Sequence, residues 1–229
     1  MPSFDIVKKT SAPKTFRVAS ILGKFDLQSE EITERFSGAI DMPQDWQVGL
    51  IVGKSGTGKT TIAKQLFPDS YITAYNYLKE SVLDDMPESA SVEEITMAFN
   101  SVGFSSPPSW LKPYAVLSNG EKMRADLARA ILEENNLIVF DEFTSVVDRN
   151  VAQMSSFAMQ KAIRKSKKKL IAVTCHADVE DWLTPDWTFC TDSMTFTVNQ
   201  KKNDQKLNFQ SMRQQTKNLL GRCFLNTTI

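Results

Sequence analysis

The sequence has few of the residues that mark several common classes of protein. Its 229 residues include 3 cysteines, at no metal-ligand spacing, and 1 histidine, which argues against a zinc domain or a disulfide framework. No apolar run approaches the roughly 18 residues that a membrane-spanning helix needs, and the polar N-terminus is unlike a signal peptide. Lys plus Arg and Asp plus Glu both number 27, so net charge indicates no particular partner. These absences predict one domain, or one domain with an appendage, that keeps its thiols reduced in the cytoplasm.

The sequence does contain a complete phosphate-binding loop. Residues 53–60 read Gly-Lys-Ser-Gly-Thr-Gly-Lys-Thr and fit the pattern G-x-x-x-x-G-K-[ST]. An apolar run, 48–52, precedes the loop and a helix-like stretch, 61–66, follows it, which is the strand–loop–helix setting that such a loop requires. Glycines let backbone N–H groups face phosphate oxygens, and the helix N-terminus adds the positive end of a dipole.

This loop supplies most of the predicted nucleotide contacts. They come from Gly53, Lys54, Ser55, Gly56, Thr57, Gly58, Lys59, Thr60 and Thr61. Lys59 is expected to reach the β- and γ-phosphates of ATP, and Thr60 to offer its hydroxyl to Mg²⁺.

Two acids follow a short, wholly apolar strand candidate, Leu137 to Phe140. Acids at the C-terminal end of a parallel strand meet the phosphate site. Asp141 is therefore expected to bind Mg²⁺, directly or through water, and Glu142 to polarise the attacking water as a general base. The alternative is that the pair only caps a helix.

A third segment, Leu117-Ser118-Asn119-Gly120-Glu121, opens a predicted helix. Here the chain resembles the ATP-binding cassette (ABC) ATPases, whose signature usually reads Leu-Ser-Gly-Gly-Gln before a helix rich in arginine and alanine. A serine hydroxyl, a glycine amide and a helix dipole together form an anion site. The resemblance implies that Ser118, Asn119 and Gly120 contact ATP held by a second chain. A capping box of Ser118 with Glu121 is a structural alternative that does not exclude this role.

Two further positions extend the resemblance. Asp148, in Ser145-Val146-Val147-Asp148, stands where the family has its D-loop, and His176 follows a strand candidate, 170–174, where the family has its switch histidine. An imidazole there can hydrogen-bond the γ-phosphate. The resemblance therefore implies a homodimeric, head-to-tail ATPase that binds ATP and Mg²⁺, with Lys59, Glu142 and His176 as catalytic residues.

The order of motifs predicts an α/β fold of the P-loop NTPase type. We expect an ABC-type nucleotide-binding domain over 14–198, with a mainly parallel core sheet, an N-terminal antiparallel β-layer and a short helical arm, followed by a polar basic tail over 199–229. Strands are expected at 16–27, 36–40, 48–52, 71–77, 137–140, 170–174 and 195–198. Helices are expected at 84–100, 118–134 and 151–165.

The chain departs from the family pattern between the phosphate loop and the signature. That interval is short for the family, and it has no glutamine from residue 68 to residue 152. ABC ATPases usually have a glutamine there that binds Mg²⁺ and senses the transmembrane partner. Asp84 or Asp85 could replace it as an acidic metal contact, or both could belong to a solvated acidic turn.

Two other features leave alternatives open. The aromatic residue that stacks on adenine could be Phe16, Phe25 or Phe36, with Phe25 slightly favoured, or all three could belong to the core. Basic clusters at 161–169 and 201–222 could follow the phosphates of a nucleic acid, or could be a solvated helix face and a tail.

Three functional classes fit these observations. The missing glutamine, short arm and basic clusters favour a stand-alone soluble ABC ATPase, coupled to nucleic-acid processing, DNA modification or defence, with a nucleic acid or a DNA-modifying enzyme as partner. The second class is the ATP-binding subunit of a membrane transporter, whose partner would be a permease. The third is a regulatory module that binds ATP without useful turnover.

Overall fold

The computed structural model describes residues 3–27, 32–72 and 74–199. Its strands form a six-stranded sheet of order β4-β5-β6-β3-β7-β8 and a separate antiparallel pair, β1–β2. The strands are β1 (Ser3–Thr10), β2 (Ile32–Ala39), β3 (Val48–Val52), β4 (Tyr71–Ile72), β5 (Leu137–Phe140), β6 (Lys169–Thr174), β7 (Trp187–Cys190) and β8 (Thr195–Val198). The α-helices are α1 (Phe16–Lys24), α2 (Lys59–Leu66), α3 (Val92–Ser101), α4 (Pro107–Trp110), α5 (Asn119–Leu132), α6 (Arg149–Lys165) and α7 (Val179–Leu183).

The six-stranded sheet is parallel except for β8, which runs antiparallel to β7. Its central strands alternate their apolar side chains between two covered faces. Leu50 and Ala172 belong to one core cluster, whereas Ile51 and Val173 belong to the other. Burial on both faces explains why β3, β5 and β6 read as continuous apolar runs, and it confirms the predicted parallel core.

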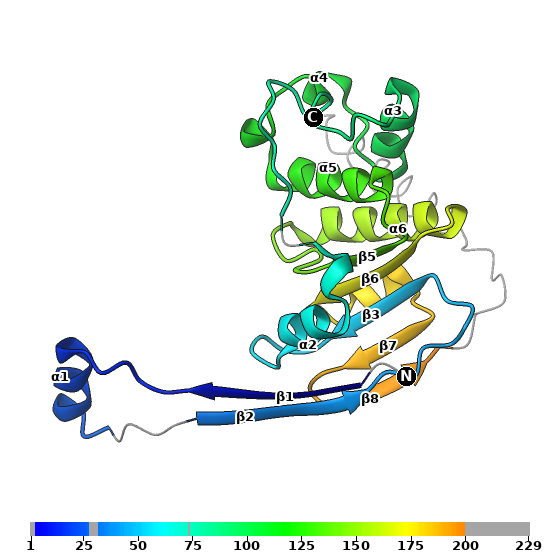
Figure 1. The fold of residues 1–229 in the computed structure, drawn as a ribbon. Helices are drawn as coiled ribbons and strands as arrows, with labels where there is room; N and C mark the ends of the chain where they lie inside the picture. Colours follow the sequence, from blue (N-terminus) through cyan, green and yellow to red (C-terminus); the bar gives the residue numbers. More distant parts are fainter. Residues whose placement is uncertain (1–2, 28–31, 73, 200–229) are drawn as a thin grey trace, which may run out of the picture. The chain divides into compact units, whose positions relative to one another are not determined.

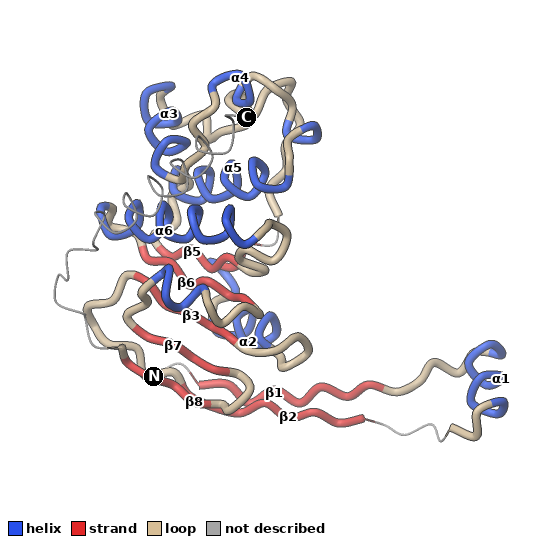
Figure 2. Tube along the Cα trace, turned by 180° about the vertical axis from the view of Figure 1, so that it is seen from behind, coloured by secondary structure: helices blue, strands red, loops and turns tan. Residues whose placement is uncertain are grey.

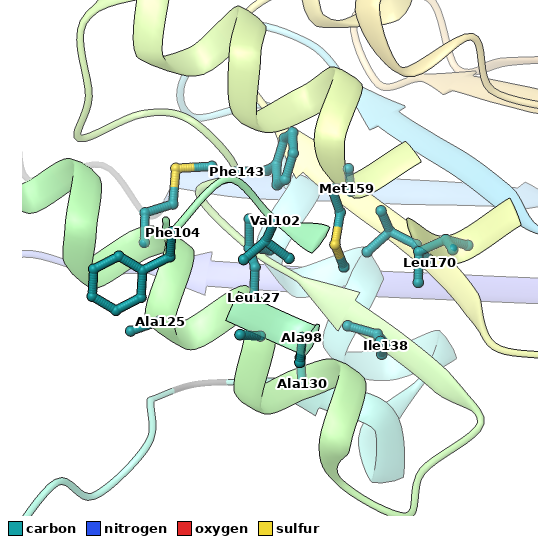
Figure 3. Packing of buried hydrophobic residues seen from close by; sticks show 14 of the residues in the cluster. Ala98, Val102, Phe104, Ala125, Leu127, Ala130, Ile138, Phe143, Met159 and Leu170 are labelled. Carbon is teal, nitrogen blue, oxygen red and sulfur yellow. The ribbon is translucent and has the colours of Figure 1, made fainter. Parts of the chain in front are cut away.

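Helices cover the two faces of this sheet (Figures 1 and 2). The helices α5 and α6, with α3 beyond α5, lie over one face, and α2 lies on the other, next to the β1–β2 pair. Figure 3 shows Leu127 of α5 and Met159 of α6 close to Ile138 and Leu170 of the sheet, and all four side chains are at most 1% exposed. This packed layer fixes α5 and the loop that precedes it relative to the strand ends.

The N-terminal antiparallel pair confirms the predicted β-layer, but one of its expected strands is wrong. Residues 16–24 form helix α1 instead of a strand, because Thr15 caps that helix and accepts a hydrogen bond from the Val18 amide and because apolar residues recur at helical spacing. The strand that pairs with β2 is β1, which the sequence analysis does not predict. Its inner side chain Phe4 is buried and packs edge-on against Phe189 at a centroid distance of 5.8 Å.

The remaining expected elements are found, some with the expected ends and others with shifted ends. The strands at 48–52, 137–140 and 195–198 are confirmed, whereas β4 covers only two residues of the expected 71–77. The acidic helix begins at Val92, not at residue 84, after a capping box of Ser91 and Glu94. No helix within the described ranges has a stretch long and apolar enough to cross a bilayer. The domain limits 14–198 stay a prediction, and the tail from residue 200 lies outside the described residues.

Candidate active site

The phosphate loop joins β3 to α2 at the C-terminal edge of the sheet. Gly58 precedes α2 with a positive φ of 85°, a conformation that glycine adopts without strain. Gly53 is needed for a close approach, because a Cβ there would lie 2.2 Å from Oγ1 of Thr191. The loop is held from outside by Asp192, whose carboxylate accepts a hydrogen bond of 2.9 Å from the Lys54 amide. The loop is therefore preformed by strand β7 and the residues that follow it.

Lys59 is held inside this loop. Its side chain is only 8% exposed, and its ammonium donates a hydrogen bond of 2.6 Å to the carbonyl oxygen of Lys54. A buried cation with one protein acceptor has donor capacity left for phosphate oxygens. This position agrees with the predicted role of Lys59.

Thr60 and Asp141 meet, as predicted for a Mg²⁺ site. The Thr60 hydroxyl donates to Oδ2 of Asp141 at 2.7 Å, although 81 residues separate the two. Hydroxyl and carboxylate oxygens are the hard ligands that Mg²⁺ prefers, and this metal is usually bound with substrate phosphates and not by a cage of protein groups. Within the described part of the chain, no group of three or more His, Cys, Asp or Glu side chains could hold a metal. A cation at this site would therefore depend on Thr60, Asp141 and the nucleotide together.

Glu142 lies beside this pair in a strained backbone conformation. Its φ is 51°, a left-handed value that costs a non-glycine residue about 1–2 kcal/mol. The amide of Glu142 donates 2.8 Å to Oδ1 of Asp141, and the next residue, Phe143, is fully buried. The turn thus sends Phe143 into the core and leaves Glu142 exposed at the site, where a general base is needed.

Tyr71 is a member of the site that the sequence analysis misses. Its hydroxyl donates to Oδ2 of Asp141, the oxygen that also accepts from Thr60. Burial, and then the bond to Asp141, raise the pKa of Tyr71, so the hydroxyl stays a proton donor at neutral pH. No sequence motif marks Tyr71; the pairing of its strand with β5 brings it to Asp141.

A pocket of about 210 Å³ lies over the loop. It is lined by Lys8, Phe36, Ser55, Gly56, Gly58, Lys59, Thr60, Thr61 and Glu142. Lys8 and Phe36 come from the β1–β2 pair, and only Phe36 is among the expected adenine contacts. A larger hollow of about 340 Å³ beside β4 contains none of the predicted nucleotide residues, so the chemistry points to the smaller pocket.

The preference for Phe25 as the adenine contact is not supported. Phe16 and Phe25 lie at the two ends of α1 and are 88% and 61% exposed. Phe36 is half-buried, and its ring comes within 3.1 Å of the position that a Cβ on Gly58 would occupy. Among the three candidates, Phe36 is therefore the aromatic ring at the phosphate loop.

The signature segment forms the predicted capping box. The Glu121 amide donates to Ser118 Oγ at 3.3 Å, and the Ser118 amide donates to Glu121 at 2.9 Å. A further hydrogen bond of 2.6 Å from Ser109 and the bonds from Ser118 lower the pKa of Glu121 to about 2. Gly120 allows α5 to approach α6, because a Cβ there would lie 3.2 Å from Val151. None of Ser118, Asn119 and Gly120 lines the pocket at the phosphate loop.

The two remaining predicted positions lie at the same edge of the sheet. Asp148 is the N-cap of α6 and accepts 3.0 Å hydrogen bonds from the amides of Asn150 and Val151. His176 follows β6, and its amide donates to Thr174 at 3.2 Å. Neither side chain lines the pocket of this single chain, and their roles toward nucleotide stay predictions.

The acidic residues proposed as a replacement for the missing glutamine are engaged elsewhere. Asp85 is buried and accepts hydrogen bonds from the amides of Leu78 and Lys79, and Asp84 bonds with Ser81. Both carboxylates therefore stabilise a local turn, and the alternative of a solvated acidic turn fits the exposed Asp84 but not the buried Asp85.

Half of the basic side chains in the cluster at 161–169 make contacts within the protein. Arg164 forms an ion pair of 3.1 Å with Asp186, Lys168 donates to the carbonyl of Asn135 at 2.7 Å, and the Lys169 ammonium lies 4.9 Å from the ring of Trp46. Only Lys161, Lys165 and Lys167 are exposed. The second cluster, at 201–222, lies outside the described residues.

Comparisons with known proteins agree with an ATPase domain. The chain matches the model of the family described as "ATPase family associated with various cellular activities (AAA)" over residues 49–185, more than half of its length. It is 30% identical over 105 residues to a probable ATP-binding cassette sub-family F member 3 homolog of Encephalitozoon cuniculi, covering 44% of this chain and 19% of that protein. It is also 30% identical over 136 residues to an uncharacterized ABC transporter ATP-binding protein of Haemophilus influenzae, covering 47% and 55%.

A solved structure has the same fold. The dimeric, post-hydrolysis ATP-binding cassette MJ0796, bound to ADP and Pi, superimposes with a TM-score of 0.56 at 14% identity, covering 81% of this chain and 94% of that one. At this identity the likeness shows the fold alone. The chain also spans less than two thirds of the length of both curated relatives.

A phosphate loop, an aspartate at the end of the neighbouring parallel strand and a glutamate beside it define a P-loop ATPase domain. The chain belongs to the ATPase family associated with various cellular activities. Its resemblance to the ABC ATPases is confirmed by the relatives and by the fold.

Proposed function

We propose that two copies of this chain close head-to-tail around two molecules of ATP and open when the ATP is hydrolysed. One observation carries the proposal. The pocket at the phosphate loop brings together the loop, Glu142 and the β1–β2 pair, whereas Ser118 is exposed and lines no part of it. A second copy, related by a two-fold axis, would bring its Ser118 and Gly120 to the open side of the pocket.

Different residues of one chain bind the phosphates, the adenine and the Mg²⁺ ion. Lys59 and the amides of the loop hold the β- and γ-phosphates, and Phe36 offers its ring to the adenine. Thr60 and Asp141 would hold Mg²⁺, which, when bound, neutralises charge on the β- and γ-phosphate oxygens. Lys8 adds a cation from β1 at the same pocket.

Hydrolysis follows from the position of Glu142. Its carboxylate accepts a proton from water as the water oxygen bonds to the γ-phosphorus and the bond to the bridging oxygen breaks, which gives ADP and phosphate. His176 would align the γ-phosphate once the second chain has closed the site. Loss of the γ-phosphate removes the charge shared between the two chains, so the dimer opens.

The biological role of ATP hydrolysis depends on the partner to which the dimer is bound. The names of several relatives, including the one from H. influenzae, describe ABC transporter ATP-binding proteins, and half of the basic cluster expected to contact nucleic acid serves internal contacts. We therefore favour a transporter subunit over the nucleic-acid role suggested by the sequence. Co-purification with a polytopic membrane protein supports this choice, whereas salt-sensitive DNA binding that is lost when Lys165 and Lys167 are neutralised overturns it.

The dimer is tested with Glu142→Gln. This change removes the base but keeps the shape, so it should slow hydrolysis by a factor of about 10² to 10⁴ and accumulate a dimer at saturating ATP. Light scattering after size exclusion, with and without ATP, measures the change. Lys165→Gln, an exposed position away from the site, is the control. A Glu142→Gln protein that binds ATP and stays monomeric contradicts the proposal.

A further inference from the structure

The carboxylate of Asp141 is held by three hydrogen-bond donors from different parts of the chain. Oδ2 accepts from the hydroxyls of Thr60 and Tyr71, and Oδ1 accepts from the amide of Glu142. With donors on both oxygens, the carboxylate has one favoured rotation about its last torsion. Tyr71 is the only one of the three donors that belongs neither to the phosphate loop nor to the segment of Asp141 itself.

The position of Tyr71 is fixed independently of Asp141. The strand β4 pairs Tyr71 with Val139 of β5, and Asp141 directly follows β5, so the two residues of the hydrogen bond lie close together. Lys64 of α2 also lies over the face of the ring, with its ammonium 4.9 Å from the ring centroid. The hydroxyl is thus placed by the backbone and by packing, and it can hold Asp141 in turn.

We propose that Tyr71 is a positioning residue for the Mg²⁺ site, which acts by fixing the orientation of the Asp141 carboxylate. This inference rests on the proposed function, because it takes Asp141 and Thr60 as the residues that hold the metal. Groups that orient a metal ligand in this way typically contribute 10- to 100-fold to metal affinity. In a chain without the usual glutamine, Tyr71 is the described side chain between the phosphate loop and the signature that reaches the predicted metal ligands.

A purely structural role makes a different prediction. If the hydroxyl only pins β4 to β5, its loss lowers the stability of the protein and affects nucleotide binding equally with and without metal. If it positions Asp141, its loss weakens only the part of ATP binding that depends on Mg²⁺. The ratio of the two dissociation constants therefore separates the two roles.

The test measures binding of a fluorescent ATP analogue to the full chain, in Mg²⁺ and in EDTA. Tyr71→Phe should raise the Kd in Mg²⁺ by about 10-fold and change the Kd in EDTA by less than about twofold. Tyr75→Phe is the matched control, because its hydroxyl has no hydrogen bond to any residue that the structure describes. It should keep both constants.

The outcomes separate this inference from the proposed function. Equal changes in both media, or none in either, overturn the role of Tyr71. If the unmodified chain binds the analogue no better in Mg²⁺ than in EDTA, Asp141 and Thr60 do not hold the metal. The proposed function is then overturned, and the role of Tyr71 with it.

Discussion

Two helix N-termini of this chain are predicted to contact phosphate, and they are capped in different ways. Helix α2 begins after Gly58, which offers no side-chain cap, and has no acidic residue in its first turn. Helix α5 begins after Ser118, its N-cap, which forms a reciprocal capping box with Glu121. Both termini have the same dipole, with a positive end that attracts anions. No side chain of the cap accepts from the first N–H groups of α2, so they can donate to a ligand. In α5 the amide of Glu121 already donates to the hydroxyl of Ser118.

The difference in capping follows from how each helix N-terminus is stabilised when no nucleotide is bound. The α2 terminus is held by surrounding structure, including Thr191 and Asp192, so it can leave its amides free. The α5 terminus is exposed on one chain and would fray without a cap. On the proposed function, the terminus that meets a second copy has its own cap, whereas the terminus held within one chain has none.

The largest expected effect comes from the α2 terminus. Lys59→Ala removes a buried ammonium that faces the phosphates, and charge-assisted bonds of this kind contribute about 1.5–3 kcal/mol each. With more than one phosphate oxygen to contact, ATP affinity should fall by about 100-fold or more. Calorimetric titration with ATP measures the loss.

Lys165→Ala is the charge-matched control for Lys59→Ala, because Lys165 is exposed near the end of α6 and should leave ATP affinity unchanged. Unfolding curves of both variants show whether the fold is intact. Retained ATP binding by a folded Lys59→Ala protein would remove the difference between the two termini and with it the site assignment.

A smaller effect is expected at the α5 terminus, and the chain provides its own control. Ser118→Ala and Ser91→Ala each remove the serine of a capping box, from α5 and α3, and each should lower the free energy of unfolding by about 1 kcal/mol. Only Ser118→Ala should also reduce ATP-dependent dimerisation and ATPase activity. Equal activity of the two variants would mean that Ser118 is a cap and nothing more.

Mixing two variants sharpens this result. In a head-to-tail dimer of Lys59→Ala with a Ser118 variant, one site has both defects and the other has none. Random mixing should restore about a quarter of the activity, because half of the dimers are mixed and each has one intact site of two. If Ser118 served the nucleotide of its own chain, mixing would restore nothing.

The sequence predicts this site well where one segment defines it and poorly where the fold brings segments together. The phosphate loop follows from its glycines and Lys59, and the pairing of Thr60 with Asp141 follows from the order of parallel strands. Tyr71 and Lys8 belong to no motif, so only the register of β4 with β5 and the packing of β1 reveal them.

The wrong predictions also concern features that depend on contacts between segments or on weak local signals. The helix α1 contains Phe16, Val18 and Ile21, residue types that are common in strands, and only the cap at Thr15 with the spacing of its apolar side chains indicates a helix. Strand β1 lacks a clean alternation, because the apolar Val7 is exposed and Lys8 shares the register of the inner Phe4. Asp85 looks like a metal ligand because the sequence does not show that the amides of Leu78 and Lys79 occupy its carboxylate.

The smallest predicted effect concerns the charge at the α5 terminus. Glu121 stands where the family usually has glutamine, and its pKa of about 2 keeps it ionised at any physiological pH. A negative charge in the first turn competes with a phosphate for the helix dipole, an effect of about 0.3–1 kcal/mol at such positions. Glu121→Gln should therefore tighten the ATP-dependent dimer by about two- to fivefold, measured by analytical ultracentrifugation in the Glu142→Gln background.

The same change should have a cost in stability that depends on pH. Because the pKa of Glu121 lies below its ordinary value of 4.5, the ionised side chain stabilises the folded state above pH 4.5, and this contribution is lost as the pH falls toward 2. Denaturation at pH 6 and at pH 3 should show a smaller difference for Glu121→Gln than for the unmodified chain, by well under about 1 kcal/mol since solvent screens the site. A variant that loses stability at pH 6 without any gain in dimer affinity would show that the carboxylate caps α5 and does not oppose the phosphate.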